Sequence, residues 1–207
     1  MTDSAGLTIR RATPADAPAV AELALRTFMD AFAADSDPHD LALHTARTYG
    51  VPQQSAEIAH PGIITLLAEV DGHPAAYAQI RRVTPPSCVP DADAVEIARF
   101  YVDQAWHGRG IAQCLMHAAL AEVRGMGART AWLMTYEHNH RAIAYYAKEG
   151  FREVGRNGYL FGNTLENDRV LVRDLADVVD AADGATANGT AGHRGNHGNH
   201  GNRGTTG

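Results

Sequence analysis

The 207-residue chain contains a single lysine, Lys148, and only two cysteines, Cys88 and Cys114. The cysteines are far apart and form no Cys-x-x-Cys pair, which favours a reduced, cytoplasmic protein. No apolar stretch approaches 18 residues, and no apolar run near the start resembles a signal peptide. We therefore expect neither a membrane span nor secretion.

The net charge of −6 argues against a nucleic-acid partner, because such proteins carry basic surfaces. Hydrophobic residues make up 45% of the chain, enough for one well-packed domain. We place this domain at residues 1–179. Residues 180–207 are rich in Gly, Asn and His and lack aromatics, so we expect a disordered tail. Its three histidines, at positions 193, 197 and 200, have no rigid geometry, and we expect no metal site.

Alternation of apolar and polar residues, together with turn and capping residues, predicts a series of short elements. The expected strands cover residues 7–10, 63–70, 73–83, 95–102 and 130–136, with two short strands near 159–161 and 170–173. The expected helices cover residues 13–32, 37–49, 53–59, 111–124 and 140–149. This order indicates an α+β fold with a mixed, mostly antiparallel central sheet flanked by helices.

A glycine-rich turn joins the strand at 95–102 to the following helix. Simple alternation places Glu96, Ala98, Phe100 and Val102 on one face of the strand and Val95, Ile97, Arg99 and Tyr101 on the other. The turn, His107-Gly108-Arg109-Gly110-Ile111-Ala112, directs backbone N–H groups outward at a helix N-terminus. Such a turn suits a phosphate or pyrophosphate.

Two common phosphate-binding motifs do not match this turn. A P-loop requires Gly-Lys-Ser/Thr, whereas Gly110 is followed by Ile111 and Ala112. The dinucleotide fingerprint requires a third Gly or Ala, where this chain has Gln113, and an acidic residue about 20 positions later, where none stands.

A second segment narrows the interpretation. It has the pattern Asn139-x-x-Ala142-Ile143-x-x-Tyr146-x-x-x-Gly150-Phe151. The two segments together resemble the GNAT acetyltransferase superfamily, whose loop pattern is Gln/Arg-x-x-Gly-x-Gly/Ala. His107 replaces the usual Gln or Arg. The resemblance covers residues 7–175 and looks closest to the bacterial spermidine/spermine N-acetyltransferase branch, on the residues Arg26, Thr27, Phe28, Trp132, Leu133, Glu137, Gly155, Gly162 and Asp168.

The resemblance implies a GNAT-like fold with acetyl-CoA, or another acyl-CoA, as co-substrate. Backbone groups near Phe100, Tyr101 and Val102 would then bind the thioester and pantetheine, if a bulge splays this strand from the next. Asn139 would contact the pantetheine arm, and Tyr146 would lie near the sulfur. The pyrophosphate would be held by His107, Gly108, Arg109, Gly110, Ile111 and Ala112.

Acetyl transfer to an amine needs a proton acceptor for the ammonium and a proton donor for the leaving thiolate. We predict Glu96 as the base, acting through water, and Tyr146 as the acid, with Tyr145 as the neighbouring alternative. Phe28, Phe32 and Asp35 are the predicted acceptor-binding residues, although both phenylalanines would equally suit the core.

Three functions stay open. The first is acetyl transfer to a primary amine of a small molecule such as a polyamine. The second keeps the fold but uses an acyl carrier protein as donor, or acts on an antibiotic or natural-product amine or a protein N-terminus. The third is a non-catalytic acyl-CoA-binding module. A homodimer formed through a sheet edge is also left open.

Overall fold

The computed structural model describes residues 6–34 and 36–175. Asp35 and the predicted tail at 180–207, with its histidines, lie outside the described residues, as does the 179/180 boundary. The strands are β1 (Leu7–Arg11), β2 (Ile63–Val70), β3 (His73–Arg81), β4 (Val95–Val102), β5 (Thr130–Thr135), β6 (Arg152–Phe161) and β7 (Thr164–Asp174). The helices are α1 (Ala17–Phe32), α2 (Pro38–Thr48), α3 (Val51–Ala59), α4 (Ile111–Gly125) and α5 (His140–Lys148).

The described strands form one sheet in the order β1-β2-β3-β4-β5-β7-β6. Only the β4–β5 pair is parallel, and every other neighbouring pair is antiparallel. This arrangement confirms the predicted α+β class. Among the described residues, no helix is long and apolar enough to cross a membrane.

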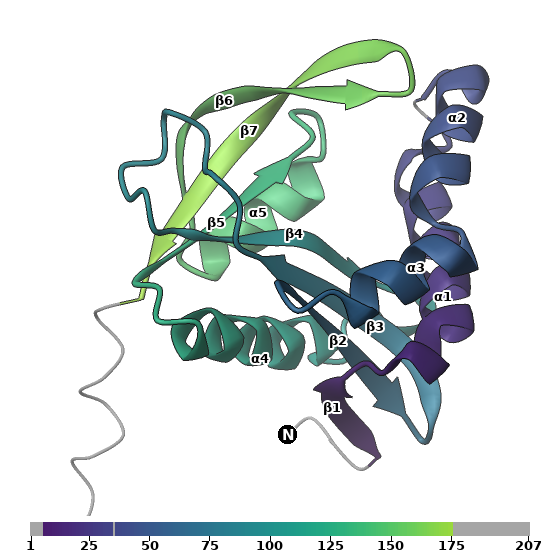
Figure 1. Cartoon of the computed structure of the whole chain (residues 1–207). Helices are drawn as coiled ribbons and strands as arrows, with labels where there is room; N and C mark the ends of the chain where they lie inside the picture. The colour runs from purple at the N-terminus through teal and green to yellow at the C-terminus, as the bar shows by residue number, and fades with distance from the viewer. Residues whose placement is uncertain (1–5, 35, 176–207) are drawn as a thin grey trace, which may run out of the picture. The chain divides into compact units, whose positions relative to one another are not determined.

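Helices cover both faces of the sheet (Figure 1). Alternate residues of β2 enter different cores: Leu66 and Ala68 pack with α4, whereas Leu67 packs with α1. Burying apolar side chains on both faces is what stabilises the two layers of helices. The α4 core also takes Tyr146 from α5, which places that helix on the same face as α4.

A bulge in β4 corrects the predicted face assignment. Arg99 pairs with Gln79 but Ile97 pairs with Ile80, so Ala98 is an extra residue in β4. Simple alternation fails at this point because a bulge shifts the side-chain period by one. Val95 and Ile97 therefore share the α4 face with Phe100 and Val102, whereas Glu96 shares the opposite face with Arg99 and Tyr101.

The parallel ladder between β4 and β5 is very short. It pairs Val95 with Ala131 and Glu96 with Trp132, and no pairing follows. Beyond Glu96 the two strands separate, as expected from the sequence. The backbone of β4 after the bulge consequently has no sheet partner on its β5 side.

β6 and β7 are much longer than the two short strands predicted near 159–161 and 170–173. They pair from Arg152–Val172 to Phe161–Thr164 as one hairpin. The prediction was wrong about their extent because most of β6 is exposed and lacks apolar alternation.

The tip of the β6–β7 hairpin is bound to α2. The Asp40 carboxylate accepts hydrogen bonds from the Asn163 N–H at 2.7 Å and from the Thr164 hydroxyl at 2.6 Å. These bonds lower the pKa of Asp40, the Thr164 bond most. At Gly162, where φ is 58°, an added Cβ would lie 2.5 Å from Asp40, so this close approach requires glycine.

Candidate active site

A cavity of about 990 Å³ lies beside the separated strands. It is lined by parts of α1, β4, the glycine-rich turn, β5, α5 and the β6–β7 hairpin. The cavity brings together these sequence-predicted residues: Phe28, Phe32, Glu96, Phe100, Tyr101, Val102, His107, Gly108, Gly110, Ile111, Ala112, Asn139 and Tyr146. Arg109 does not line it, and its guanidinium lies 4.9 Å from the centre of the Trp106 ring.

The glycine-rich turn adopts a conformation that its two glycines make possible. Gly108 has φ 76° and Gly110, the N-cap of α4, has φ 80°. Positive φ values cost little only for glycine. A Cβ placed on Gly108 would meet no atom within 4 Å, so the loop backbone is open to a ligand. The N-terminus of the 15-residue α4 adds partial positive charge.

Two side-chain hydrogen bonds hold this turn against its neighbours. His107 Nε2 lies 2.8 Å from the Val102 carbonyl oxygen and donates to it, because a carbonyl can only accept. The Tyr145 hydroxyl donates to the Ala112 carbonyl at 2.9 Å. His107 thus ties the end of β4 to the start of the turn, and Tyr145 ties α5 to the first turn of α4.

Glu96 lies at the point where β4 and β5 separate. Its side chain is almost fully buried, and Arg81 Nε donates to Glu96 Oε2 at 2.5 Å across the β3–β4 pair. The ion pair compensates the buried charge and orients the carboxylate. On the other side, Glu96 is in register with Trp132, which also lines the cavity. The buried indole N–H of Trp132 has no hydrogen-bond partner among the described residues.

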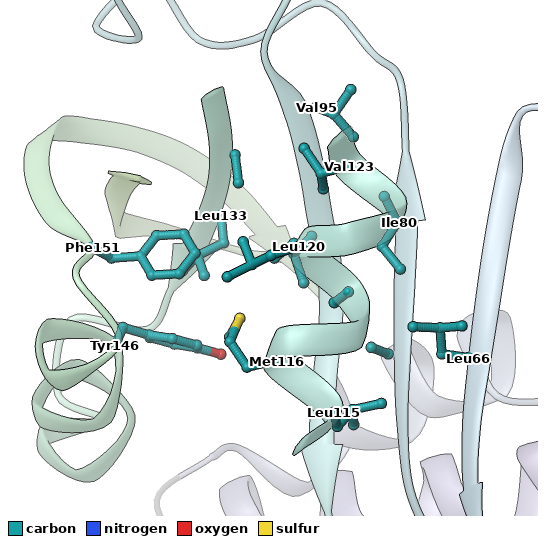
Figure 2. Close-up of a cluster of buried hydrophobic side chains, with 14 of the residues drawn as sticks. Leu66, Ile80, Val95, Leu115, Met116, Leu120, Val123, Leu133, Tyr146 and Phe151 are labelled. Atoms are coloured by element: carbon teal, nitrogen blue, oxygen red, sulfur yellow. The ribbon is translucent and has the colours of Figure 1, made fainter. Parts of the chain in front are cut away.

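Tyr146 is buried among aromatic rings on the α4 face of the sheet, opposite to the face that carries Glu96. Its ring contacts Phe100 at 6.4 Å and Phe151 at 5.8 Å. Figure 2 shows the hydroxyl pointing from α5 in the direction of α4 and Met116. Burial raises the pKa of the phenol, and the nearby Tyr101 raises it further. Tyr146 is therefore protonated at neutral pH.

Asn139 has a local structural role as well as a place in the cavity wall. Its Oδ1 accepts from the Ala142 N–H at 3.1 Å and caps α5. The cap fixes the start of the helix that carries Tyr146. The residue type that the motif requires at position 139 is thus explained in part by helix capping.

Aromatic rings form the wall of the cavity next to α1. The Phe28 ring centre lies 4.6 Å from that of Phe32 and 5.0 Å from that of Tyr49. Phe161, from the end of β6, lies 6.1 Å from Phe28. Phe28 is both a core residue and a lining residue, so the two interpretations offered for it are compatible.

A buried ion pair that the sequence did not predict supports this wall. Arg99 lies 2.6 Å from Glu57 of α3, and Gln79 donates to the same carboxylate at 3.0 Å. Burial opposes ionisation of Glu57, but the bonds and charge of Arg99 outweigh it and lower the pKa of Glu57. The Arg99 guanidinium also lies 5.4 Å from the Tyr49 ring centre.

Two acidic residues of β7, Glu166 and Asp168, line the cavity and were not predicted as site residues. Asp168 is in register with Asn157 and shares a face with Val170, which packs on Trp132. The alternation Asp168-x-Val170-x-Val172 could have indicated an inward-facing carboxylate, had the strand been extended to residue 168.

The residues present fit an acyl thioester that carries a pyrophosphate. The open turn at α4 suits the phosphates, the unpaired side of β4 suits a chain that hydrogen-bonds to backbone, and Glu96 and Tyr146 lie in one cavity. Fold and site together define an acyl-thioester-dependent transferase.

Comparison with known proteins identifies the family. The model of the acetyltransferase (GNAT) family matches residues 19–151, and the chain belongs to this family. An uncharacterized N-acetyltransferase of Mycobacterium bovis is 32% identical over 161 residues, covering 78% of this chain and 99% of the relative. The protein is accordingly a GNAT-type N-acetyltransferase.

Solved structures agree with the fold. The PaiA N-acetyltransferase of Thermoplasma acidophilum, determined with coenzyme A, has a TM-score of 0.69 at 17% identity, covering 81% of this chain and 98% of that one. YncA, a putative acetyltransferase of Salmonella typhimurium determined with acetyl-CoA, has a TM-score of 0.61 at 21% identity, covering 82% and 94%.

Proposed function

We propose that this enzyme acetylates a primary amine of a small molecule by direct attack of the amine on acetyl-CoA. The observation that carries the proposal is that one cavity holds a buried carboxylate, Glu96, and a buried phenol, Tyr146, beside the gap between β4 and β5. A polyamine is the acceptor class that we favour from the sequence.

The donor half of the site consists of backbone groups. We assign the turn from His107 to Ala112 to the pyrophosphate, with its N–H groups at the start of α4. The backbone from Phe100 to Val102 and the Asn139 side chain would bind the pantetheine arm. When bound, acetyl-CoA supplies an activated thioester carbon, and the β4 N–H groups would stabilise the oxyanion.

Proton transfer is assigned to two side chains. An aliphatic ammonium has a pKa near 10.4, so Glu96 would take its proton, through water, before the amine attacks. A C–N bond to the acetyl carbon then forms, the nitrogen, now cationic, loses its second proton to water, and the C–S bond breaks. Tyr146 would protonate the departing thiolate, and its phenolate would regain a proton from solvent.

The acceptor would enter along the wall that contains Phe28 and Phe32. Both rings line the cavity on the face of the sheet that carries Glu96. Aromatic walls of this kind pack on methylene chains and attract cations. They therefore suit an aliphatic amine.

A second candidate donor is an acyl group on a carrier-protein phosphopantetheine. The observation in its favour is that His107 Nε2 is engaged by the Val102 carbonyl. A carrier protein would present the pantetheine arm without the adenosine part of coenzyme A.

Calorimetric titration with acetyl-CoA and, separately, with acetyl-pantetheine distinguishes these donors. Micromolar binding of acetyl-CoA with weak binding of acetyl-pantetheine supports the proposal, and a panel of amines with product detection by mass spectrometry then identifies the acceptor. Failure to bind acetyl-CoA would contradict it. A binding module without activity predicts acetyl-CoA binding but no product with any amine.

A further inference from the structure

One carboxylate in the cavity has no compensating partner. Asp168 is only 7% exposed, and its Oδ1 is buried without a hydrogen bond to any described residue. The residue nevertheless lines the cavity. A buried carboxylate oxygen without a partner is costly, and it requires an explanation such as a bound cation.

The surrounding charges leave this part of the wall negative. Glu166, two residues away on the same face of β7, also lines the cavity. Neither acid forms an ion pair with a described residue. Arg81 and Arg99 also line the cavity, but Arg81 pairs with Glu96 and Arg99 pairs with Glu57. The wall formed by Asp168 and Glu166 is therefore an unneutralised anionic surface in a cavity large enough for an organic cation.

The electrostatics of Asp168 agree with this geometry. Burial, together with the smaller effects of the Glu166 and Glu137 charges, raises the pKa of Asp168 to about 6. At neutral pH the carboxylate is mostly ionised. The titratable and charged groups around it are Glu166 on β7, Glu137 after β5 with its ion-pair partner Arg156 on β6, Tyr159 on β6 and Tyr101 on β4.

Asp168 is too far from Glu96 to act on the same amine. Glu96 of β4 is in register with Trp132 of β5, and Trp132 is in register with Val172 of β7. Asp168 lies four residues further along β7, which corresponds to roughly 13 Å at about 3.3 Å per residue. The two carboxylates thus mark separate parts of one cavity.

We propose that Asp168, assisted by Glu166, binds a second cationic group of the acceptor while the reacting amine lies near Glu96 and Tyr146. This inference rests on the proposed function and adds a specificity determinant to it. Acceptors with two amines separated by an alkyl chain are then preferred over monoamines of the same length.

The test compares α,ω-diaminoalkanes of four to ten carbons with 1-aminoalkanes of matching length. For the wild-type enzyme we expect a KM roughly tenfold or more lower for the best diamine than for its monoamine, because one charge-assisted contact is lost with the monoamine. Asp168→Asn should raise the diamine KM by a similar factor and the monoamine KM by much less, so that the preference for the diamine is lost. Asp93→Asn, an exposed acid outside the cavity, is the matched control.

Loss of folding is separated from loss of binding by the thermal midpoint and by the ratio of the diamine KM to the monoamine KM, which a general loss of folded enzyme would not change. If Asp168→Asn retains the diamine preference, or if the wild type shows none, the inference is overturned. Glu166→Gln should produce a smaller loss in the same direction. Diamine affinity of the wild type should also fall as pH decreases through about 6, and this dependence should disappear in Asp168→Asn.

A binding measurement keeps this inference distinguishable from the proposed function. If no amine is acetylated, calorimetry of the diamines with the coenzyme A-bound protein still tests the subsite. Diamine binding that Asp168→Asn weakens supports the subsite even though the proposed activity fails. Equal binding by both proteins, or no binding by either, overturns the subsite.

Discussion

Tyr145 and Tyr146 are adjacent on α5, with ring centres 5.6 Å apart, and both rings contact Phe100 and line the cavity. They differ in that the Tyr145 hydroxyl donates to the Ala112 carbonyl, whereas Tyr146 is buried as a member of the core. The two positions differ by about 100° around the helix. This separation makes the pair a matched control for the proposed acid.

We expect Tyr146→Phe to lower kcat by about 10²-fold or more and leave the Kd for acetyl-CoA unchanged, because only the proton donor is removed. Tyr145→Phe should instead weaken acetyl-CoA binding by roughly fivefold, since it releases one hydrogen bond from the turn. Steady-state kinetics and calorimetry on both variants check this. Equal kcat values for Tyr146→Phe and the wild type would remove Tyr146 from the mechanism.

We expect Glu96→Gln to lower kcat at pH 7 by about 10²-fold, because the amide cannot accept the ammonium proton. The deficit should shrink as pH rises toward 10, where free amine forms in solution without a base. A pH–rate profile measures this. Asp93→Asn is the control, and a constant deficit at all pH values would indicate that Glu96 serves only as the structural partner of Arg81.

His107 should act on donor binding and not on chemistry. His107→Ala removes the bond to the Val102 carbonyl, and we expect acetyl-CoA to bind roughly fivefold more weakly with little change in kcat. His107→Gln should restore affinity, because its amide can donate to the same carbonyl. Unchanged acetyl-CoA binding by His107→Ala would show that the hydrogen bond from His107 to the Val102 carbonyl does not organise the turn.

Asp168→Asn should stabilise the protein. Because folding raises the pKa of Asp168 to about 6, the folded state binds more protons than the unfolded state between about pH 4 and 6, and stability falls as pH rises through that range. Above pH 6 the buried charge lowers the free energy of unfolding by a constant amount, about 1 to 3 kcal/mol. The neutral side chain of Asn removes this loss. Urea unfolding at pH 4 and pH 7 should show the gain mainly at pH 7. An equal effect at both pH values would contradict the electrostatic cause.

Local sequence patterns were sufficient to predict the elements that depend on neighbours in the chain. Gly108 and Gly110 allow the turn, Asn139 caps α5, and the apolar spacing of α4 buries one face, because each involves residues only a few positions apart. The two motifs that contain the glycines and Asn139 resemble the GNAT family, and this resemblance supplied the donor loop and the candidates Glu96 and Tyr146.

Which side chains face one another across strands depends on the complete fold. The bulge at Ala98 places Glu96 with Arg99 and not with Phe100, and pairing across the sheet joins Arg81 to Glu96. Likewise Glu57 of α3 reaches Arg99, and the long β6–β7 pairing turns Asp168 into the cavity. A one-residue shift reverses every following side chain, and strand register is set by contacts between distant segments. Local sequence patterns carry no information on such contacts, so the Arg99–Glu57 pair and the placement of Asp168 in the cavity became apparent only in the folded chain.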